Sequence, residues 1–452
     1  MSFISLEFVL LFLLCFTLYH FISDKGRKFV LLAASGVFIG YFNPAFLVTA
    51  LVVSLFTYGA AILIEQAREK GRGFRLIYWG GISCLVLCWI GFRYANRLTG
   101  DSGFIFPLGM SFYTFQAIGY LTEVYWEEEK AERRPIDFLL YMLLFMKFLS
   151  GPIERSADLL PQVRKLSPAS YSMMTYGLKL IVVGLVKKLV LADHIAPYND
   201  GVFSSMHTAS GVQLLMACLL YPIELYADFS GYTDMAIGIG MLFGLKLSSN
   251  FAHPFAAQTT AEFWRRWHIT LGRWFRDYVY IPLGGSRKGR LRTMFNLFAV
   301  WILTALWHGA GYNFLIWGGM LLGALFLEKL FLLPFLQNSK VIGHVYLLLF
   351  VPVTWMAFTI TDVHQLGIYL TRMFPFVNAH TGMVNSMDYI KYLKDYDSLL
   401  AMGVLFATPV PAVIYGRIKR GMLGTLAIAV IFALSMYYLA VSANNPFLYF
   451  NF

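Results

Sequence analysis

Two histidines near the middle of the chain have surroundings in which an imidazole can do chemistry. His268 lies within WRRWHITLGRWFRDYVY, and His308 ends the apolar part of FAVWILTALWHGAG. Charging an imidazole at membrane depth costs on the order of several kcal/mol, so we expect His308 to be neutral and hydrogen-bonded, or to line a water-filled cavity. A neutral imidazole there can act as a general base toward a hydroxyl group. The alternative is a histidine that only hydrogen-bonds to a neighbouring helix.

The segment that carries His268 has the periodicity of an amphipathic helix, which we predict over residues 261–280. Its bulky apolar side chains fall on one arc of the helical wheel: Trp264, Trp267, Leu271, Trp274, Phe275 and Tyr278. Its guanidinium groups fall on the other side: Arg265, Arg266, Arg273 and Arg276. Such a helix should lie in the cytoplasmic interface, with its aromatic face toward the membrane and its arginines toward water.

These arginines allow two interpretations. They can brace the helix at the interface without binding a ligand. Alternatively, together with Arg287 and Lys288 of the following PLGGSRKGRLR, they can hold a phosphate-bearing donor such as a nucleotide thioester. The glycine turn in that segment lacks the spacing of a P-loop, so it does not indicate nucleotide hydrolysis.

Other residues that could support catalysis lack the spacing for it. Asp228 and Asp234 of DFSGYTD would point about 120° apart on a helix, which favours structural caps or arginine partners over a paired catalytic site. All four cysteines lie in apolar runs, and Cys84 and Cys88, one helical turn apart, have no histidine or carboxylate nearby to complete a metal site. The sequence also contains no GxSxG or HExxH motif. We therefore predict no metal site.

The composition shows what kind of molecule must position these residues. Hydrophobic residues make up 58% of the 452 positions and charged residues only 13%, too little polar surface for a water-soluble core of this size. The formal net charge of +11 is spread over short loops, as in a polytopic membrane protein whose basic loops stay in the cytoplasm. No basic soluble module exists to bind nucleic acid. We predict an all-α polytopic membrane protein in contact with lipid.

Runs of about 20 apolar residues predict roughly 11 to 12 membrane crossings with both termini outside. Residues 1–452 are expected to form one membrane-embedded domain, with a catalytic core over residues 224–320. A tight hairpin is expected at Asn43-Pro44, and residues 137–149 are too short to span with certainty and suit a re-entrant or interfacial helix. Lys187 and Lys188 conflict with this topology unless they snorkel or face a cavity.

Long runs of sequence carry a family resemblance. They are YADFSGYTDMAIGIGMLFGLKLSSNFAHPF, EFWRRWHITLGRWFRDYVYIPLGG and LWHGAGYNFLIWG, with GMSFYTFQAIGYLTEVYW, SGPIERSADLLPQ and NNPFLYFNF elsewhere. Together they resemble the membrane-bound O-acyltransferase superfamily, and specifically its bacterial alginate O-acetyltransferase branch. In this resemblance His308, in WHG, matches the family's invariant histidine, and His268, in RWHIT, matches the second histidine of the branch. After FLIWG the chain reads GMLLGALF, where alginate-type relatives usually carry a further histidine.

The resemblance implies transfer of an acyl group, usually acetyl, from a cytosolic thioester to an extracytoplasmic polysaccharide such as alginate. Acetyl-CoA would be the donor substrate, with no bound cofactor, and the protein would be a multi-pass protein of the bacterial cytoplasmic membrane. Relatives often pass the acyl group to a separate extracytoplasmic SGNH-type acetyltransferase. This chain contains no hydrolase-like domain, so such a partner is expected.

A mechanism follows as a hypothesis. The six cations named above would bind the donor's phosphates, and His308 would deprotonate the acceptor hydroxyl or become acetylated itself. His268 would orient the donor carbonyl or stabilise developing charge. One alternative is teichoic-acid D-alanylation, with a carrier protein as donor. An alternative of another class is a transporter or lipid-linked glycan flippase, which would show inverted repeats that this sequence lacks.

Overall fold

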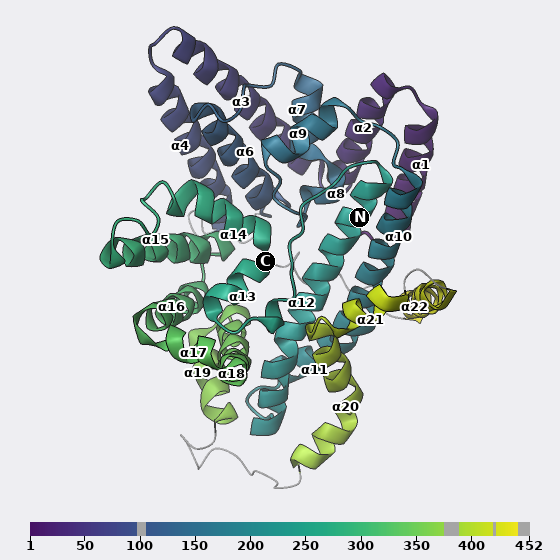
Figure 1. Cartoon of the computed structure of the whole chain (residues 1–452), viewed down its shortest axis with the longest axis vertical. Helices are drawn as coiled ribbons and strands as arrows, with labels where there is room; N and C mark the ends of the chain where they lie inside the picture. The colour runs from purple at the N-terminus through teal and green to yellow at the C-terminus, as the bar shows by residue number, and fades with distance from the viewer. Residues whose placement is uncertain (97–104, 375–387, 419–421, 442–452) are drawn as a thin grey trace. The chain divides into compact units, whose positions relative to one another are not determined.

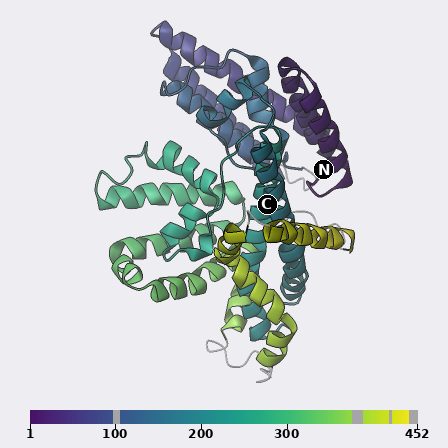
Figure 2. The same ribbon diagram turned by 45° about the vertical axis from the view of Figure 1, so that its right-hand side comes forward.

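The computed structural model describes residues 1–96, 105–374, 388–418 and 422–441. These residues form helices and no sheet, as the ribbon shows from two sides (Figures 1 and 2). One isolated β-bridge joins Phe251 to Trp267. The predicted all-α fold is therefore confirmed.

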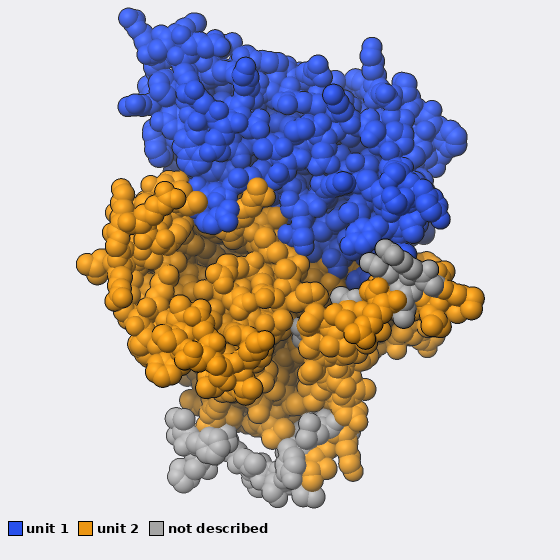
Figure 3. Space-filling view, viewed as in Figure 1, with its two compact units in different colours: residues 1–183, 232–249, 276–278 blue, residues 184–231, 250–275, 279–452 orange. Residues whose placement is uncertain are grey.

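The chain folds into two compact units, each built from segments that are distant in sequence (Figure 3). Unit 1 comprises residues 1–183, 232–249 and 276–278. Unit 2 comprises residues 184–231, 250–275 and 279–452. That residues 1–452 act as one domain stays a prediction.

Unit 1 starts with helices joined by short turns. Its helices are α1 (Leu6–Phe21), α2 (Asp24–Phe42), α3 (Pro44–Glu69), α4 (Phe74–Arg93), α6 (Met110–Tyr125), α7 (Pro135–Leu143), α8 (Phe145–Phe148) and α9 (Ser156–Arg164). The hairpin predicted at Asn43-Pro44 is confirmed, because α2 ends and α3 begins there. The Ala45 N–H donates to the Asn43 side chain at 2.9 Å, and Pro44 suits a first helical turn, where its missing N–H costs nothing.

Polar side chains of α6 face protein, as their place in an apolar segment predicts. Gln116 and Glu123 are buried. The Lys147 ammonium, buried on α8, donates to Gln116 Oε1 at 2.5 Å. The two helices within residues 135–148 have only nine and four residues, so the segment expected to be too short to span is indeed short and broken.

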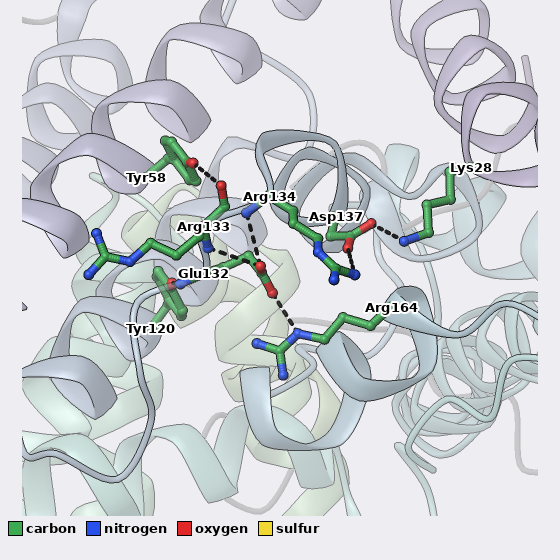
Figure 4. Close-up of polar contacts among 8 residues, drawn as sticks. All are labelled: Lys28, Tyr58, Tyr120, Glu132, Arg133, Arg134, Asp137 and Arg164. Atoms are coloured by element: carbon green, nitrogen blue, oxygen red, sulfur yellow. Dashed lines mark hydrogen bonds and ion pairs between the residues drawn. The ribbon is translucent and has the colours of Figure 1, made fainter. Parts of the chain in front are cut away.

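The buried carboxylate of Glu132 lies at the centre of a cluster of hydrogen bonds in unit 1 (Figure 4). Its oxygens accept hydrogen bonds from the backbone N–H groups of Arg133 and Arg134 at 2.9 and 3.0 Å, and from Arg164 Nε at 2.6 Å. Its own N–H donates to the Tyr120 hydroxyl at 2.7 Å. These hydrogen bonds connect the loop before α7 to Tyr120 on α6 and to Arg164 on α9.

Unit 2 holds most of the predicted catalytic core, residues 224–320, of which residues 232–249 and 276–278 belong to unit 1. Its helices are η1 (Val186–Ala192), α11 (Asp193–Ser204), η2 (Pro254–Ala256), α13 (Thr260–Arg266), α14 (Ile269–Phe275), α15 (Arg290–His308), α16 (Tyr312–Leu327), η4 (Glu328–Leu332), α17 (Leu333–Asn338), α18 (Lys340–Thr359), α19 (Val363–Met373), α20 (Asp388–Ala407), α21 (Val410–Ile418) and α22 (Met422–Val441). Three helices have residues in both units: α10 (Tyr171–Leu185), α12 (Gly211–Leu242) and η3 (Arg276–Tyr280). Within unit 2, α16 packs against both α15 and α18. A Cβ at Gly318 would meet the Trp301 carbonyl oxygen at 3.2 Å, so glycine there lets α15 and α16 approach closely.

Among the described residues, six segments are helical, long and apolar enough to cross a membrane. They are Pro44–Glu69, Phe74–Arg93, Gly211–Leu242, Tyr312–Asn338, Lys340–Thr359 and Met422–Val441. The protein is a multi-pass membrane protein. The count of 11 to 12 crossings stays a prediction.

Candidate functional site

The predicted amphipathic helix over residues 261–280 is not continuous. It ends as α13 at Arg266, restarts as α14 at Ile269 and continues from Arg276 as the π-helix η3. Between α13 and α14, His268 has a φ of 46°, in the left-handed region that residues other than glycine seldom adopt. The prediction of one helix is therefore wrong, and the break falls at the candidate catalytic histidine.

Asn250, from a segment preceding α13, supplies the physical reason for the break. Its carbonyl oxygen accepts from the Ile269 N–H at 2.9 Å. Its side-chain Oδ1 accepts from the N–H and the hydroxyl of Thr270 at 3.1 and 2.7 Å. These bonds satisfy donors at the start of α14 that a continuous helix would have paired internally.

His268 is almost fully buried, with 3% of its surface exposed. Its ring meets that of Phe229 edge to face at a centroid distance of 5.0 Å and lies 6.4 Å from that of Trp307. Burial lowers the pKa of His268 to about 3, because an imidazolium loses its hydration in such surroundings. His268 is thus neutral at physiological pH and can act through hydrogen bonds but not as a cation.

His308 ends α15, at the short turn into α16, and is half-buried. Its ring centroid lies 5.0 Å from that of Trp317 on α16 and 4.9 Å from that of Phe358 on α18. It also lies 4.7 Å from the ring of Trp307, its neighbour in the chain. Aromatic rings on three helices therefore surround the imidazole.

The structure brings the two histidines predicted from the sequence to one indole, that of Trp307. Both belong to unit 2. The half-buried imidazole of His308 suits proton transfer. The buried, neutral imidazole of His268 suits hydrogen bonding to a substrate carbonyl. Their catalytic roles stay predictions.

The tryptophans of the predicted helix face protein and not lipid, which corrects their expected orientation. Trp267 is buried, and its ring lies 5.0 Å from that of Trp355. Trp264 lies 5.3 Å from Trp301 and 5.5 Å from Trp317. Periodicity identified the face of the segment correctly, but could not distinguish lipid from the aromatic core that α15, α16 and α18 provide.

The cations predicted to hold phosphate differ in their surroundings. Arg265, Arg276, Arg287 and Lys288 are exposed, and Arg266 and Arg273 are half-buried. Arg266 pairs with Glu262 at 2.6 Å, and Arg276 pairs with Asp277 at 2.7 Å. Arg276 belongs to unit 1 and the other five to unit 2. Phosphate binding by these residues stays a prediction.

The two lysines that conflicted with the expected topology have partners in unit 2. The Lys188 ammonium is buried and lies 2.7 Å from Asp228 and 2.9 Å from Asp193. Lys187 lies over the ring of Tyr226, with its nitrogen 5.5 Å from the centroid. Asp228 thus has the ion-pairing role that its spacing favoured, although its partner is a lysine and not an arginine.

Three residues on α16 and α18, close to His308, were not identified as candidate site residues from the sequence. Asn313, Trp317 and Trp355 are all buried beside its aromatic surroundings. The only signal for the first two was their spacing of four residues, one helical turn, directly after the glycine turn that follows His308. Trp355 gave no signal, because its contact with this region is long-range.

The part of the chain that holds both histidines also resembles known proteins in sequence. The family model described as MBOAT, the membrane-bound O-acyltransferase family, matches residues 127–371, which include both histidines and the tryptophan cluster. The chain is 32% identical to the probable alginate O-acetylase AlgI of Pseudomonas putida over 100% of both chains. It is 34% identical to the peptidoglycan O-acetyltransferase of Helicobacter pylori over 64% of this chain and 62% of that protein. It is 28% identical to the teichoic acid D-alanyltransferase of Bacillus subtilis over 47% of this chain and 56% of that protein.

Proposed function

This chain belongs to the membrane-bound O-acyltransferase family, and we propose that it moves an acetyl group from a cytosolic thioester across the membrane for O-acetylation of an extracytoplasmic polysaccharide such as alginate. Its O-acyltransferase activity follows from the family. Acetyl as the group and alginate as the acceptor are supported by the alginate O-acetylase that matches the whole chain. The membrane is the bacterial cytoplasmic membrane in this proposal.

The observation that carries the proposal is the arrangement of the two histidines about Trp307. His308 is half-buried, so a substrate hydroxyl can reach it, while aromatic rings keep its surroundings apolar. In such surroundings the imidazole takes the proton from the hydroxyl as the oxygen attacks the thioester carbonyl. The thiol leaves and the acetyl group becomes an ester.

An acetyl-imidazole on His308 is the second route open to the same geometry. There the ring nitrogen attacks the thioester first, the thiol leaves, and the acceptor hydroxyl then takes the acetyl group from the ring. In both routes His268, neutral because it is buried, donates a hydrogen bond to the carbonyl oxygen as negative charge develops there.

The donor is acetyl-CoA in this proposal, and its phosphates bind the exposed cations. Arg265, Arg287 and Lys288 are exposed in unit 2. Guanidinium groups bind phosphate through paired hydrogen bonds, and an ammonium adds a point charge. Arg266, Arg273 and Arg276 complete the predicted set. The 28% identity to a teichoic acid D-alanyltransferase favours a carrier protein as the alternative donor.

The acceptor side requires a further protein or the polysaccharide itself. We propose an extracytoplasmic SGNH-type acetyltransferase as the partner that completes transfer, because the described residues form helices and no domain of the hydrolase type. A direct transfer to the polysaccharide is the other arrangement that the chemistry permits.

Thioester turnover in nanodiscs tests the proposal. With acetyl-CoA and a thiol reporter, His308→Ala should lower turnover by about 10²–10⁴-fold, the usual contribution of a general base. His364→Ala, at an exposed histidine without a proposed role, is the matched control and should behave as wild type.

Acetyl transfer that persists in folded, membrane-inserted His308→Ala would exclude the role of His308. Absence of turnover in every variant with acetyl-CoA, and its appearance with an acylated carrier protein, would identify the alternative donor. Translocation of a glycan without thioester consumption would instead indicate a transporter.

A further inference from the structure

Three buried polar atoms beside His308 have no hydrogen-bond partner. They are Oδ1 of Asn313, Nε1 of Trp317 and Nε1 of Trp355. The side chains are 0%, 0% and 3% exposed. Buried polar atoms in native proteins are nearly always hydrogen-bonded, so a group of three in one place indicates a ligand that supplies the missing partners.

The orientation of Asn313 is fixed by its surroundings. Its Nδ2 donates to the carbonyl oxygen of Phe358 at 2.8 Å. Because a carbonyl oxygen only accepts, the NH₂ end of the amide must face Phe358 and the Oδ1 end must face the other way. Asn313 therefore offers a hydrogen-bond acceptor, while the two indoles offer donors.

These atoms come from two helices that pack together, α16 and α18. Asn313 and Trp317 are one turn apart on the same face of α16. Trp317 lies 6.1 Å from Trp355, ring to ring, and Trp355 lies 5.2 Å from Phe358. Since the rings of Trp317 and Phe358 are both within 5.0 Å of His308, the unpaired atoms belong to the surroundings of the candidate catalytic imidazole.

The ligand must offer both a donor and an acceptor. A thioester or ester has carbonyl oxygens for the indoles but no hydrogen for Asn313. A secondary amide has both. The remaining lining is aromatic, which suits methylene groups between isolated amides and does not suit a sugar with a hydroxyl on most of its carbons.

We infer that Asn313, Trp317 and Trp355 form a subsite for a secondary amide of the acyl donor. The pantetheine arm, which coenzyme A and acyl-carrier proteins share, is a chain of methylene groups interrupted by such amides. Its amide N–H would donate to Asn313 Oδ1, and its amide carbonyl would accept from an indole N–H. This inference rests on the proposed function, since it assigns a donor to the reaction at His308.

Substitution of each indole by phenylalanine tests the subsite, because it removes the N–H and keeps an aromatic ring. The readout is the ratio of kcat/KM for two small donors: S-acetyl-N-acetylcysteamine, which has a secondary amide, and the analogue in which two methylene groups replace that amide and so remove both its carbonyl and its N–H. Wild type should prefer the amide by about tenfold, the value of one net hydrogen bond. Trp317→Phe and Trp355→Phe should reduce that preference toward unity.

Trp301→Phe is the matched control. Trp301 lies in the same cluster, 5.8 Å from Trp317, and its indole nitrogen is not one of the three unpaired atoms. It should retain the preference for the amide. Equal use of both donors by wild type, or an unchanged preference in both Trp317→Phe and Trp355→Phe, would overturn the inference.

A binding measurement separates failure of the subsite from failure of the proposed function. S-ethyl-CoA and a carrier protein with an S-ethyl pantetheine arm cannot transfer an acyl group, so their Kd values do not depend on catalysis. Binding about tenfold weaker in Trp317→Phe or Trp355→Phe than in Trp301→Phe supports the subsite even if no variant turns over. The ligand whose binding weakens identifies the source of the pantetheine arm, and equal binding of both ligands in all three variants overturns the inference.

Discussion

His268 shows how a residue's surroundings change what its chemistry can be. An arginine-rich segment next to a histidine indicates a polar, charged site. The structure instead buries the imidazole between aromatic rings and holds its backbone at a φ of 46°. Of the arginines next to it, Arg265 is exposed and Arg266 pairs with Glu262. At the residue scale the surroundings of His268 are therefore apolar, and the imidazole is neutral.

The depressed pKa of His268 should make the protein less stable in mild acid. Burial lowers this pKa from 6.5 to about 3, so between these values the unfolded chain binds a proton that the folded chain excludes. The contribution of His268 to stability is full above about pH 6.5 and falls by about 1.4 kcal/mol per pH unit below it. In His268→Gln, the melting temperature in detergent should fall less steeply between about pH 6.5 and 4.5. Equal slopes would show that folded His268 takes up a proton.

The break between α13 and α14 is an element-scale feature that the sequence did not reveal. Helical periodicity located the apolar face of residues 261–280 correctly, because burial follows that face wherever the segment lies. It could not reveal the break, since the acceptors come from Asn250, outside the segment. The turn at Asn43-Pro44 was predictable because both of its signals, a capping side chain and a proline, are local.

Asn250→Ala should destabilise the protein and disturb His268. The substitution removes Oδ1, which accepts hydrogen bonds from the N–H and the hydroxyl of the buried Thr270. A buried donor left unpaired costs about 1–3 kcal/mol. Thr270→Val is the matched variant, because it removes only the hydroxyl bond and should cost less. Melting temperatures in detergent measure both, and a loss in Thr270→Val as large as that in Asn250→Ala would contradict the proposed cause of the break.

At the scale of the whole molecule, each compact unit is completed by segments from distant parts of the chain. Residues 276–278 illustrate this in unit 1, where the Tyr278 hydroxyl donates to Glu123 at 2.5 Å and Asp277 pairs with Arg155. Composition was sufficient to predict helices and a membrane, because both depend on averages over many residues. The pairing of Lys188 on η1 with Asp228 on α12 could not be predicted, because it depends on how these two helices are arranged in the fold.

The Glu132 cluster should stabilise unit 1 above about pH 4.5. Burial alone would raise the pKa of Glu132, but hydrogen bonds from the Arg134 N–H and from Arg164 outweigh burial, so the folded pKa lies below 4.5. The stabilisation is present above the unfolded value and is lost as the pH falls through the folded pKa. Glu132→Gln should lower the melting temperature at pH 7 by a few °C, and the difference from wild type should shrink in acid.

Glu65→Gln is the control for Glu132→Gln, because it tests whether loss of an exposed ion pair in the same region lowers the melting temperature equally. Glu65 pairs with Arg133, whose side chain is 51% exposed, and an exposed pair contributes about 0–1 kcal/mol. Its melting temperature should stay close to that of wild type. A Glu65→Gln effect equal to that of Glu132→Gln at pH 7 would assign the stabilisation to surface charge and not to the buried carboxylate.

The length of α15 sets the distance between two of the proposed phosphate-binding residues and His308. The helix has 19 residues and begins at Arg290, directly after the loop that carries Arg287 and Lys288, and it ends at His308. At about 1.5 Å per residue its two ends are about 28 Å apart, close to the thickness of a bilayer's hydrocarbon core. In the proposed reaction, a donor whose phosphates bind at one end must therefore carry its acyl group on a tether about as long as the helix. Short acyl phosphates have no such tether, so the proposal excludes them as donors.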